Sequence, residues 1–435
     1  MGIDEYRNGL QVASEFPFVQ ALFGRRARRF LMGASIPDGP LAFTSRHEPM
    51  PLTEIEKMIV LTAMAGNTGW NYAIMHNPYY APSLPNYSAA AGGRTFPSAA
   101  GFHTSEIFFT DDEGVYFFET RDAPALVDKS VQEMSDLNSL VEAHRKRVRK
   151  LTDGRLYLPA AEPHISGHNL WVVNRPGSML AIPVADVAQH HIANLCFGLQ
   201  NGYCLYDDIN KEPIPGLERF HKICDPVNVL PISFVEQYSL MESTTELVAS
   251  CYAGMLMLQA MGLGGWMFNG MDPYSILGAG GDPNVPGLGF RYDKDERWTL
   301  PNPTGLPGVF EGFCPPHYPD MRAAVEAFTQ RKFGPNGPFH PDTPGPWKES
   351  SRVRAAAQIH SEEFKECVAL QAQYTLDRFG KFPGTVPSIL VFIFLQAHHL
   401  DLEFYDHYFD PGAYLKTHAD HMKNWHKDKS YTAAH

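Results

Sequence analysis

Residues 94–109 read RTFPSAAGFHTSEIFF. A proline and four small residues, Pro97 to Gly101, lead into an apolar run that is typical of a β-strand. Side chains this small let another molecule approach the backbone, whose N–H groups can then donate hydrogen bonds to a flat ligand. The stretch therefore predicts a ligand site followed by a strand at 107–110. The sequence DDEG and a second strand at 115–119 would complete a hairpin.

Two other segments have residues suited to an anionic or planar ligand. GRRARRF at 24–30 groups four guanidinium forks, which suit a phosphate. GLGGW at 262–266 follows an apolar helix predicted at 244–262, and free N–H groups in such a turn can receive an anion or a ring carbonyl. Taken alone, an arginine cluster is usually a solvated face and a glycine turn is usually a helix cap. Together, the three segments favour a planar, phosphorylated cofactor.

In this order, these segments and the predicted helix PLTEIEKMIVLTAMAGNTGW resemble the nitroreductase-like flavoprotein family. The spacing of 94–109 is most similar to the peptide azoline dehydrogenase branch. The resemblance covers about 20–120 and 230–300 and implies an α+β fold, with a mixed sheet wrapped by helices, and a homodimer with two FMN sites at its interface. It implies that FMN is bound by Arg25, Arg26, Arg28, Arg29, Pro97, Ser98, Ala99, Ala100, Gly101, Leu263, Gly264, Gly265 and Trp266.

The implied activity is that of an FMN-dependent oxidoreductase, which transfers hydride through flavin N5 to or from a small, flat or apolar organic substrate. NAD(P)H is a candidate electron donor. His103 is either a proton donor near the ring or a hydrogen-bonded structural residue. The catalytic Lys and Tyr of the azoline dehydrogenases have no counterpart here. Aromatic residues suited to a substrate pocket are Trp70, Tyr72, Tyr79, Tyr80, Trp266, Phe268 and Tyr274.

Two alternatives remain open. Ala27 stands near the position of a serine in the family, and the chain is longer than a minimal nitroreductase, which would suit a flavin-free binding or scaffold protein of the same fold. The other alternative is a metal-dependent enzyme. On a helix, His399, Glu403 and His407 share one face, with His418 and His421 following, and imidazole and carboxylate groups can hold zinc or iron.

The predicted organisation is a flavin domain at 1–333 with an insertion at about 120–230. A Pro/Gly linker follows at 334–348, and then a helical C-terminal extension at 349–435. Helices are also expected at 51–65, where Thr53 and Glu56 form a capping-box pattern, and at 135–152, 186–200, 349–380 and 388–408. Short strands are expected at 155–158, 170–173 and 178–182.

The bulk composition excludes several classes of protein. A net charge of −12 over 435 residues argues against a general nucleic-acid binder, which needs a basic surface. The six cysteines form no CxxC pair and indicate reduced thiols. The N-terminus lacks a signal-peptide pattern, and the longest apolar run, ILVFIFL, is too short for a bilayer. These features predict a cytoplasmic protein with a small-molecule substrate and no membrane partner.

Overall fold

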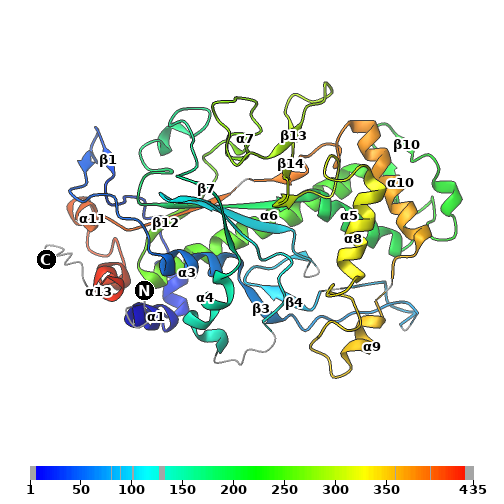
Figure 1. The fold of residues 1–435 in the computed structure, drawn as a ribbon, viewed down its shortest axis with the longest axis horizontal. Helices are drawn as coiled ribbons and strands as arrows, with labels where there is room; N and C mark the ends of the chain where they lie inside the picture. The colour runs from blue at the N-terminus through cyan, green and yellow to red at the C-terminus, as the bar shows by residue number, and fades with distance from the viewer. Residues whose placement is uncertain are drawn as a thin grey trace.

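A seven-stranded sheet forms the centre of the fold in the computed structural model, which describes residues 6–79, 81–88, 90–99, 102–126, 133–357, 359–391 and 393–426. The strand order is β12-β17-β8-β5-β6-β7, and β16 also pairs with β8 (Figure 1). The strands are β5 (Ser105–Thr110), β6 (Gly114–Phe118), β7 (Val148–Asp153), β8 (Met179–Asp186), β12 (Gly264–Phe268), β16 (Ile389–Leu390) and β17 (Phe394–His398).

Every strand pair described in this sheet is antiparallel, so the prediction of a mixed central sheet is wrong. The α+β class itself is confirmed, because helices pack against a sheet whose described strand pairs are antiparallel. A parallel pair occurs only in a separate small sheet among the described residues, where β9 (Cys204–Asp207) lies between β10 (Glu212–Pro213) and β11 (Val229–Pro231).

The central strands are covered on both faces. All eight residues of β8 and all six of β5 are buried, which explains why MLAIPVAD shows no polar alternation. On one face, Phe310 contacts the rings of Phe108 and Phe117. Figure 1 shows α7 and β13 on that face and α3 and α4 on the other. The covering elements are α3 (Glu54–Ala65), α4 (Leu137–Arg145), α7 (Pro273–Leu277), β13 (Arg291–Asp293), β14 (Asn302–Leu306) and β15 (Phe310–Glu311).

Helix α6 (Ile232–Met261) is the longest element, at 30 residues or about 45 Å. It begins twelve residues before the predicted start at 244, and Gly262, with φ +79°, ends it in the left-handed conformation that glycine favours. Near its C-terminal end it packs on α3 and β17: a Cβ at Gly254 would come within 2.6 Å of both Leu395 and Met64. The small residue therefore lets helix, helix and sheet approach closely.

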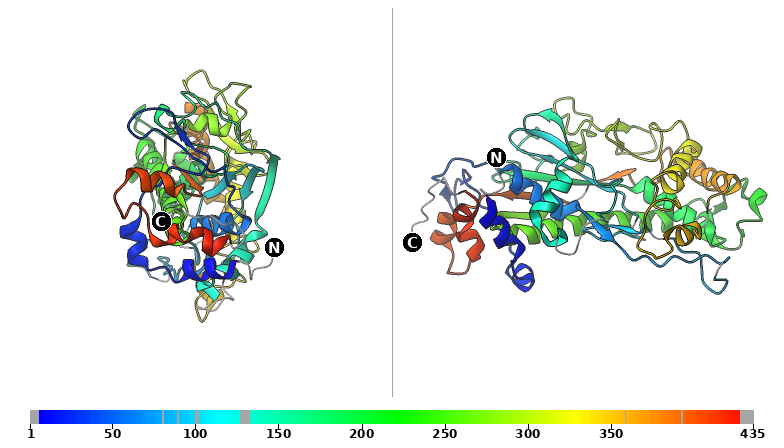
Figure 2. Two further views of the ribbon diagram at one scale, coloured as in Figure 1. Left: turned by 90° about the vertical axis from the view of Figure 1, so that its left-hand side faces the viewer. Right: turned by 60° about the horizontal axis from the view of Figure 1, so that its bottom comes forward.

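A second hydrophobic core lies at the other end of α6 (Figure 2, right). It joins α5 (Val187–Gln200), α8 (Met321–Phe333) and α10 (Glu362–Phe379) to the first turn of α6. Leu195, Phe328, Val368 and Ile232 are among its buried residues. The helices predicted at 186–200 and 349–380 are thus present in large part, whereas α8 was not predicted. The domain division at 334–348 stays a prediction.

Two predicted helices contain strands instead. The segment 135–152 is helical only to Arg145, and 148–153 forms the edge strand β7. The segment 388–408 contains β16 and β17, whose apolar residues suit a buried strand, and it is helical only from Leu402 to Tyr408. The strand predictions at 155–158 and 170–173 are also wrong, whereas 178–182 lies almost wholly within β8.

The C-terminal helices lie beside the first helix at one end of the molecule (Figures 1 and 2). A Cβ at Gly9 of α1 would come within 2.4 Å of the Trp425 ring of α13, so these helices are in close contact. Among the described residues, no helix combines the length and the apolar character needed to cross a bilayer. The remaining elements are α1 (Arg7–Ser14), α2 (Phe18–Gly24), α9 (Ser350–Ala355), α11 (Leu402–Tyr408), α12 (Lys416–Ala419), α13 (His421–Trp425), β1 (Ser35–Ile36), β2 (Phe43–Thr44), β3 (Asn67–Trp70) and β4 (Gly92–Arg94).

Candidate functional site

The structure brings together two of the three segments predicted to bind FMN. The N–H of Gly265 donates to the carbonyl of Arg28 at 2.8 Å. The Arg29 guanidinium lies 5.7 Å from the centre of the Trp266 ring and 5.9 Å from that of Trp171. The arginine cluster and the glycine-rich turn, more than 230 residues apart in sequence, therefore meet at the C-terminal end of α6.

The four arginines differ in what they can still bind. Arg28 is buried and donates to Gln259 Oε1 at 2.7 Å and to the Ala413 carbonyl at 2.8 Å. Burial lowers the pKa of Arg28 to about 10, so it remains charged at neutral pH. Arg25, Arg26 and Arg29 are partly or fully exposed. These three guanidinium groups remain accessible to a ligand, whereas Arg28 holds α6 and the C-terminal segment together.

The residues Leu263 to Trp266 do not offer a flavin ring an open surface. Leu263 is fully buried, and Gly264 to Phe268 are strand β12, paired along its length with β17. The C-terminal segment covers the preceding turn: the Thr417 carbonyl oxygen lies 2.1 Å from the position of a Cβ on Gly262. Within one chain, this segment therefore serves as a helix cap and a sheet strand.

The third segment is held against the middle of α6 by one buried carboxylate. Glu246 accepts hydrogen bonds from the N–H groups of Thr104 and Ser105, each at 3.1 Å, and from the Ser98 hydroxyl. The His190 Nε2 lies 3.2 Å away. Burial would raise the pKa of Glu246, but His190 outweighs it and holds the pKa near 2. Of the residues predicted to contact FMN, Ala100 and Gly101 lie outside the described part of the chain.

A cavity of about 690 Å³ opens beside this segment. Its lining includes Phe102 and His103, and also Trp70, the one described residue of the predicted aromatic set that lines it. Tyr72 and Tyr79 are exposed, Trp266 and Phe268 are buried in the core, and Tyr80 lies outside the described residues. The basic residues of the lining, which the sequence did not point to, are Arg94, Arg121, Arg331, Lys332 and Arg354, and the acidic one is Asp122.

The excess of cations in this cavity favours an acidic ligand. Burial lowers the pKa of Arg94 to about 10, so its charge persists at neutral pH. Arg331 donates to Asp122 Oδ1 at 2.5 Å and to Gln189 Oε1 at 2.8 Å. Burial would raise the pKa of Asp122, but Arg331 and then Arg121 outweigh it and hold the pKa below its usual value. Among the described lining residues, one carboxylate stands beside five basic side chains, and the buried Glu106 carboxyl interacts with Arg94, Arg121 and Arg331 from behind the wall. A bound anion would balance the remaining positive charge.

His103 is a neutral group in this wall. Burial, reinforced by the charge of Arg94, lowers its pKa to about 3, so the ring is not an imidazolium at neutral pH. Neither ring nitrogen has a hydrogen-bond partner among the described residues, which is uncommon for a buried side chain. The ring can therefore offer a ligand one N–H donor and one lone pair. The expectation of a hydrogen-bonded structural histidine is not met.

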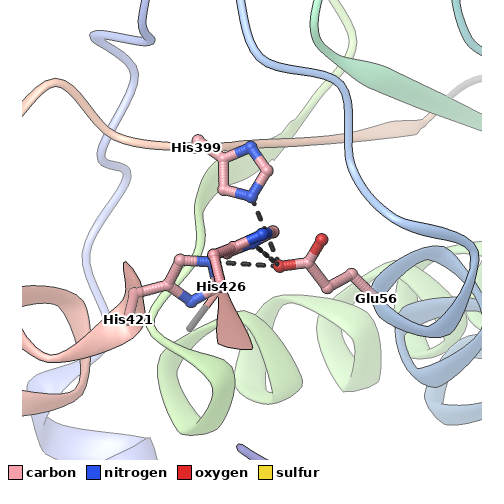
Figure 3. Close-up of side chains that lie close together, drawn as sticks. All are labelled: Glu56, His399, His421 and His426. Carbon is pink, nitrogen blue, oxygen red and sulfur yellow. Dashed lines mark hydrogen bonds and ion pairs between the residues drawn. The ribbon is translucent and has the colours of Figure 1, made fainter. Parts of the chain in front are cut away.

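The histidines predicted to share a helical face do not assemble. His399 follows strand β17 and lies outside α11. Glu403 faces His47, with 3.4 Å between Oε1 and Nε2, and His407 is exposed. His399 does meet His421, but the other members of their cluster are Glu56 and His426 (Figure 3). The sequence showed Glu56 only as a capping-box residue, a role it also has, and no local spacing connects it to the histidines.

No protein-family model matches this chain, and no curated protein matches it. Among solved structures, the chain is similar to the crystal structure of a candidate nitroreductase from Ralstonia eutropha JMP134. The two are 12% identical, with a TM-score of 0.28, over 59% of this chain and 71% of the other. A likeness at this level carries no argument for family or activity.

Proposed function

We propose that this protein is an FMN-dependent oxidoreductase whose cofactor is held between two copies of the chain. The observation that carries the proposal is an unpartnered apolar stripe on α6, the helix that contacts both the arginines and the segment at 94–105. Its members are spaced by three, four or seven residues, so they share one face of the helix. They are Phe234, Tyr238, Met241, Val248 and Tyr252, all exposed.

The stripe has the size and setting of a contact with a second copy. Helix α2, which packs on α6, adds exposed Phe18, Val19 and Phe23. Clusters of large exposed apolar side chains often mark protein–protein contact sites. The Arg25 guanidinium lies 5.7 Å from the ring centre of Tyr252, so a second copy seated on the stripe would border the arginines.

The parts of an FMN site lie apart within one chain. Arg25 contacts Met255, whereas Ser98 binds Glu246, nine positions earlier on α6 or about 14 Å along its axis. In the proposed dimer, Arg25, Arg26 and Arg29 of one copy bind the phosphate. The segment at 94–103 of the other copy borders the ring.

The chain's own residues would select and orient the substrate. The basic cavity favours a flat substrate with a carboxylate or phosphate group over a purely apolar one, and it also suits the phosphates of NAD(P)H. The neutral ring of His103 can donate one hydrogen bond to such a substrate. When bound, FMN supplies the hydride chemistry, which no protein side chain provides.

The first test is the visible absorption spectrum of the purified protein, followed by identification of any pigment that heat releases. We expect FMN. The double variant R25Q/R26Q should bind FMN about 10- to 100-fold more weakly, because it removes charge-assisted hydrogen bonds to the phosphate. R322Q, which changes a partly exposed arginine of α8 that pairs with Glu362, is the control.

The second test uses Tyr238→Asp, which places a charge in the apolar stripe. Light scattering should show a dimer for the wild-type protein and a monomer for the variant, with loss of FMN. A monomeric variant that keeps FMN would refute the shared site. A colourless wild-type protein that takes up no added FMN would refute the proposed function and favour a flavin-free protein.

A further inference from the structure

Four buried side chains converge at the end of the molecule where α1 and α13 meet. Oε1 of Glu56 lies 3.3 Å from Nε2 of His399 and 3.0 Å from Nε2 of both His421 and His426 (Figure 3). One ligand atom from each of the four residues lies within 4.8 Å of the other three. The residues come from α3, from the end of β17 and from the two ends of α13, so the cluster joins three distant parts of the chain.

The hydrogen bonds of the cluster fix which atoms face its centre. His399 Nδ1 lies 2.9 Å from the Met50 carbonyl, and His421 Nδ1 lies 2.8 Å from the Met261 carbonyl. A carbonyl can only accept, so these Nδ1 atoms carry the hydrogens, and in neutral rings the Nε2 atoms present lone pairs to the centre. Backbone carbonyls orient the histidine ligands of metal ions in this way.

Glu56 is oriented by a similar division of its two oxygens. Its Oε2 accepts from the N–H and the hydroxyl of Thr53, both at 2.7 Å, in the capping box of α3. Its Oε1 is left to face the three imidazoles. Lone pairs of nitrogen and of a carboxylate then point at one another, an arrangement that a bound cation between them, or a proton on an imidazole, would stabilise. The Nε2 atom of His421 agrees with a bound cation, because it lies close to Glu56 Oε1 but makes no hydrogen bond to a described residue.

The distances suit a small tetrahedral ion. With metal–ligand bonds of about 2.0–2.1 Å, neighbouring ligand atoms of a tetrahedral zinc site are about 3.3 Å apart. The separations of 3.0–3.3 Å between Glu56 Oε1 and the three nitrogens are close to three of the six edges, and all four atoms lie within 4.8 Å of one another. Three imidazoles and one carboxylate are borderline ligands of the kind that Zn²⁺ accepts, and hard ions such as Mg²⁺ would prefer an all-oxygen site.

We propose that Glu56, His399, His421 and His426 bind one zinc-class divalent ion through Oε1 and the three Nε2 atoms. Four protein ligands in a buried setting leave no open position, so the ion is structural rather than catalytic. It would fasten the C-terminal segment to α3 and to the central sheet. This site is independent of the flavin proposed above, because neither Glu56 nor these histidines belong to the predicted cofactor contacts.

The test starts with purified full-length protein, stripped with a chelator, dialysed against Zn²⁺ and then measured for metal by mass spectrometry. We expect about one ion per chain. Zn²⁺ should also raise the Tm, since a ligand that binds only the native state stabilises it. Wild-type protein that retains no zinc and shows no shift in Tm would overturn the proposal, and the cluster would then be a metal-free polar network.

Glu56→Gln is the decisive variant, because glutamine also completes a capping box. Its amide oxygen can take the place of Oε2 beside Thr53, and its NH₂ group can then donate to the histidine nitrogens. The variant should therefore fold, yet it should bind zinc at least about 10-fold more weakly than the wild-type protein. His421→Gln should weaken zinc binding to a similar extent. His407→Gln, at an exposed histidine of α11, is the matched control and should bind as wild type. Equal zinc binding by E56Q and H407Q would overturn the proposal.

Discussion

Replacing Glu246 with alanine should destabilise the protein strongly, because this one side chain fastens the segment 94–105 to α6. Its carboxylate has no exposure and accepts from two backbone N–H groups and two hydroxyls, with His190 in contact. Alanine would leave the N–H groups of Thr104 and Ser105 buried without these acceptors.

The magnitude follows from those two donors. Each buried donor left without a partner costs about 1–3 kcal/mol, so two cost about 4 kcal/mol. Breaking a buried ion pair such as that between Glu246 and His190 costs about 3–5 kcal/mol. This cost overlaps with the cost of the two unpaired donors, so the two figures are not added. Glu246→Gln keeps one acceptor oxygen, and its NH₂ group can donate to Ser98 or to a neutral His190. We expect a smaller loss of about 1–2 kcal/mol for that variant.

The assay is urea unfolding followed by tryptophan fluorescence, with hydrogen exchange at the Thr104 and Ser105 amides as a local probe. Glu242→Ala is the control. Glu242 forms a longer contact of 3.5 Å with the other ring nitrogen of His190 and, among the described residues, accepts a hydrogen bond from Asn194 but none from a backbone N–H, so its loss should cost clearly less than the loss of Glu246. An E246A protein within about 1 kcal/mol of wild type, or no more destabilised than E242A, would refute the reasoning.

Two further predictions concern pH and packing. Burial raises the pKa of Glu106 from 4.5 to about 7, so the folded state holds a proton that the unfolded state has lost, and about 3 kcal/mol of stability should disappear as pH rises from 4.5 to 7. The decrease of the unfolding free energy with rising pH across this range should be smaller in Glu106→Gln than in the wild-type protein. An unchanged decrease would exclude Glu106 as its source. Gly265 has φ +146°, and a Cβ there would lie 2.0 Å from the Gln396 carbonyl oxygen, so Gly265→Ala should lower stability by about 3 kcal/mol or more. Thermal unfolding would measure this loss, and in the same experiment Gly69→Ala, where a Cβ meets nothing within 4 Å, should change stability by less than about 0.5 kcal/mol.

Local sequence signals predicted local structure well. The Thr53–Glu56 capping box marked the start of α3 correctly, because both of its hydrogen bonds lie within four residues. The hairpin at 105–118 followed from an apolar run interrupted by DDEG. By contrast, 388–408 was predicted as a helix, since its apolar character suits either a helix or a buried strand. The partners that decide the matter, β8 and β12, lie far away in sequence.

The candidate sites show the same division between local and distant information. Arg29 and Trp266 were singled out for their residue types, and the structure places them in contact. The helical spacing of His399 and His407 was misleading because His399 follows a strand. Sequence spacing could not show that Glu56 and His426 belong to one cluster, because the distance between them depends on how the C-terminal segment docks. The basic cavity was missed for the same reason: Arg94 and Arg331 meet there only through tertiary folding.

The position of β17 has a consequence for how the chain acquires its structure during synthesis. Residues 394–398 lie in the interior of the central sheet, between β8 at 179–186 and β12 at 264–268. A ribosome must therefore deliver residues 394–398 before these two strands can be joined, and until then each has an unpaired edge. Nascent or C-terminally shortened chains would expose those edges to neighbouring molecules, so we expect chaperone dependence and inclusion-body formation to increase sharply when translation stops before residue 398.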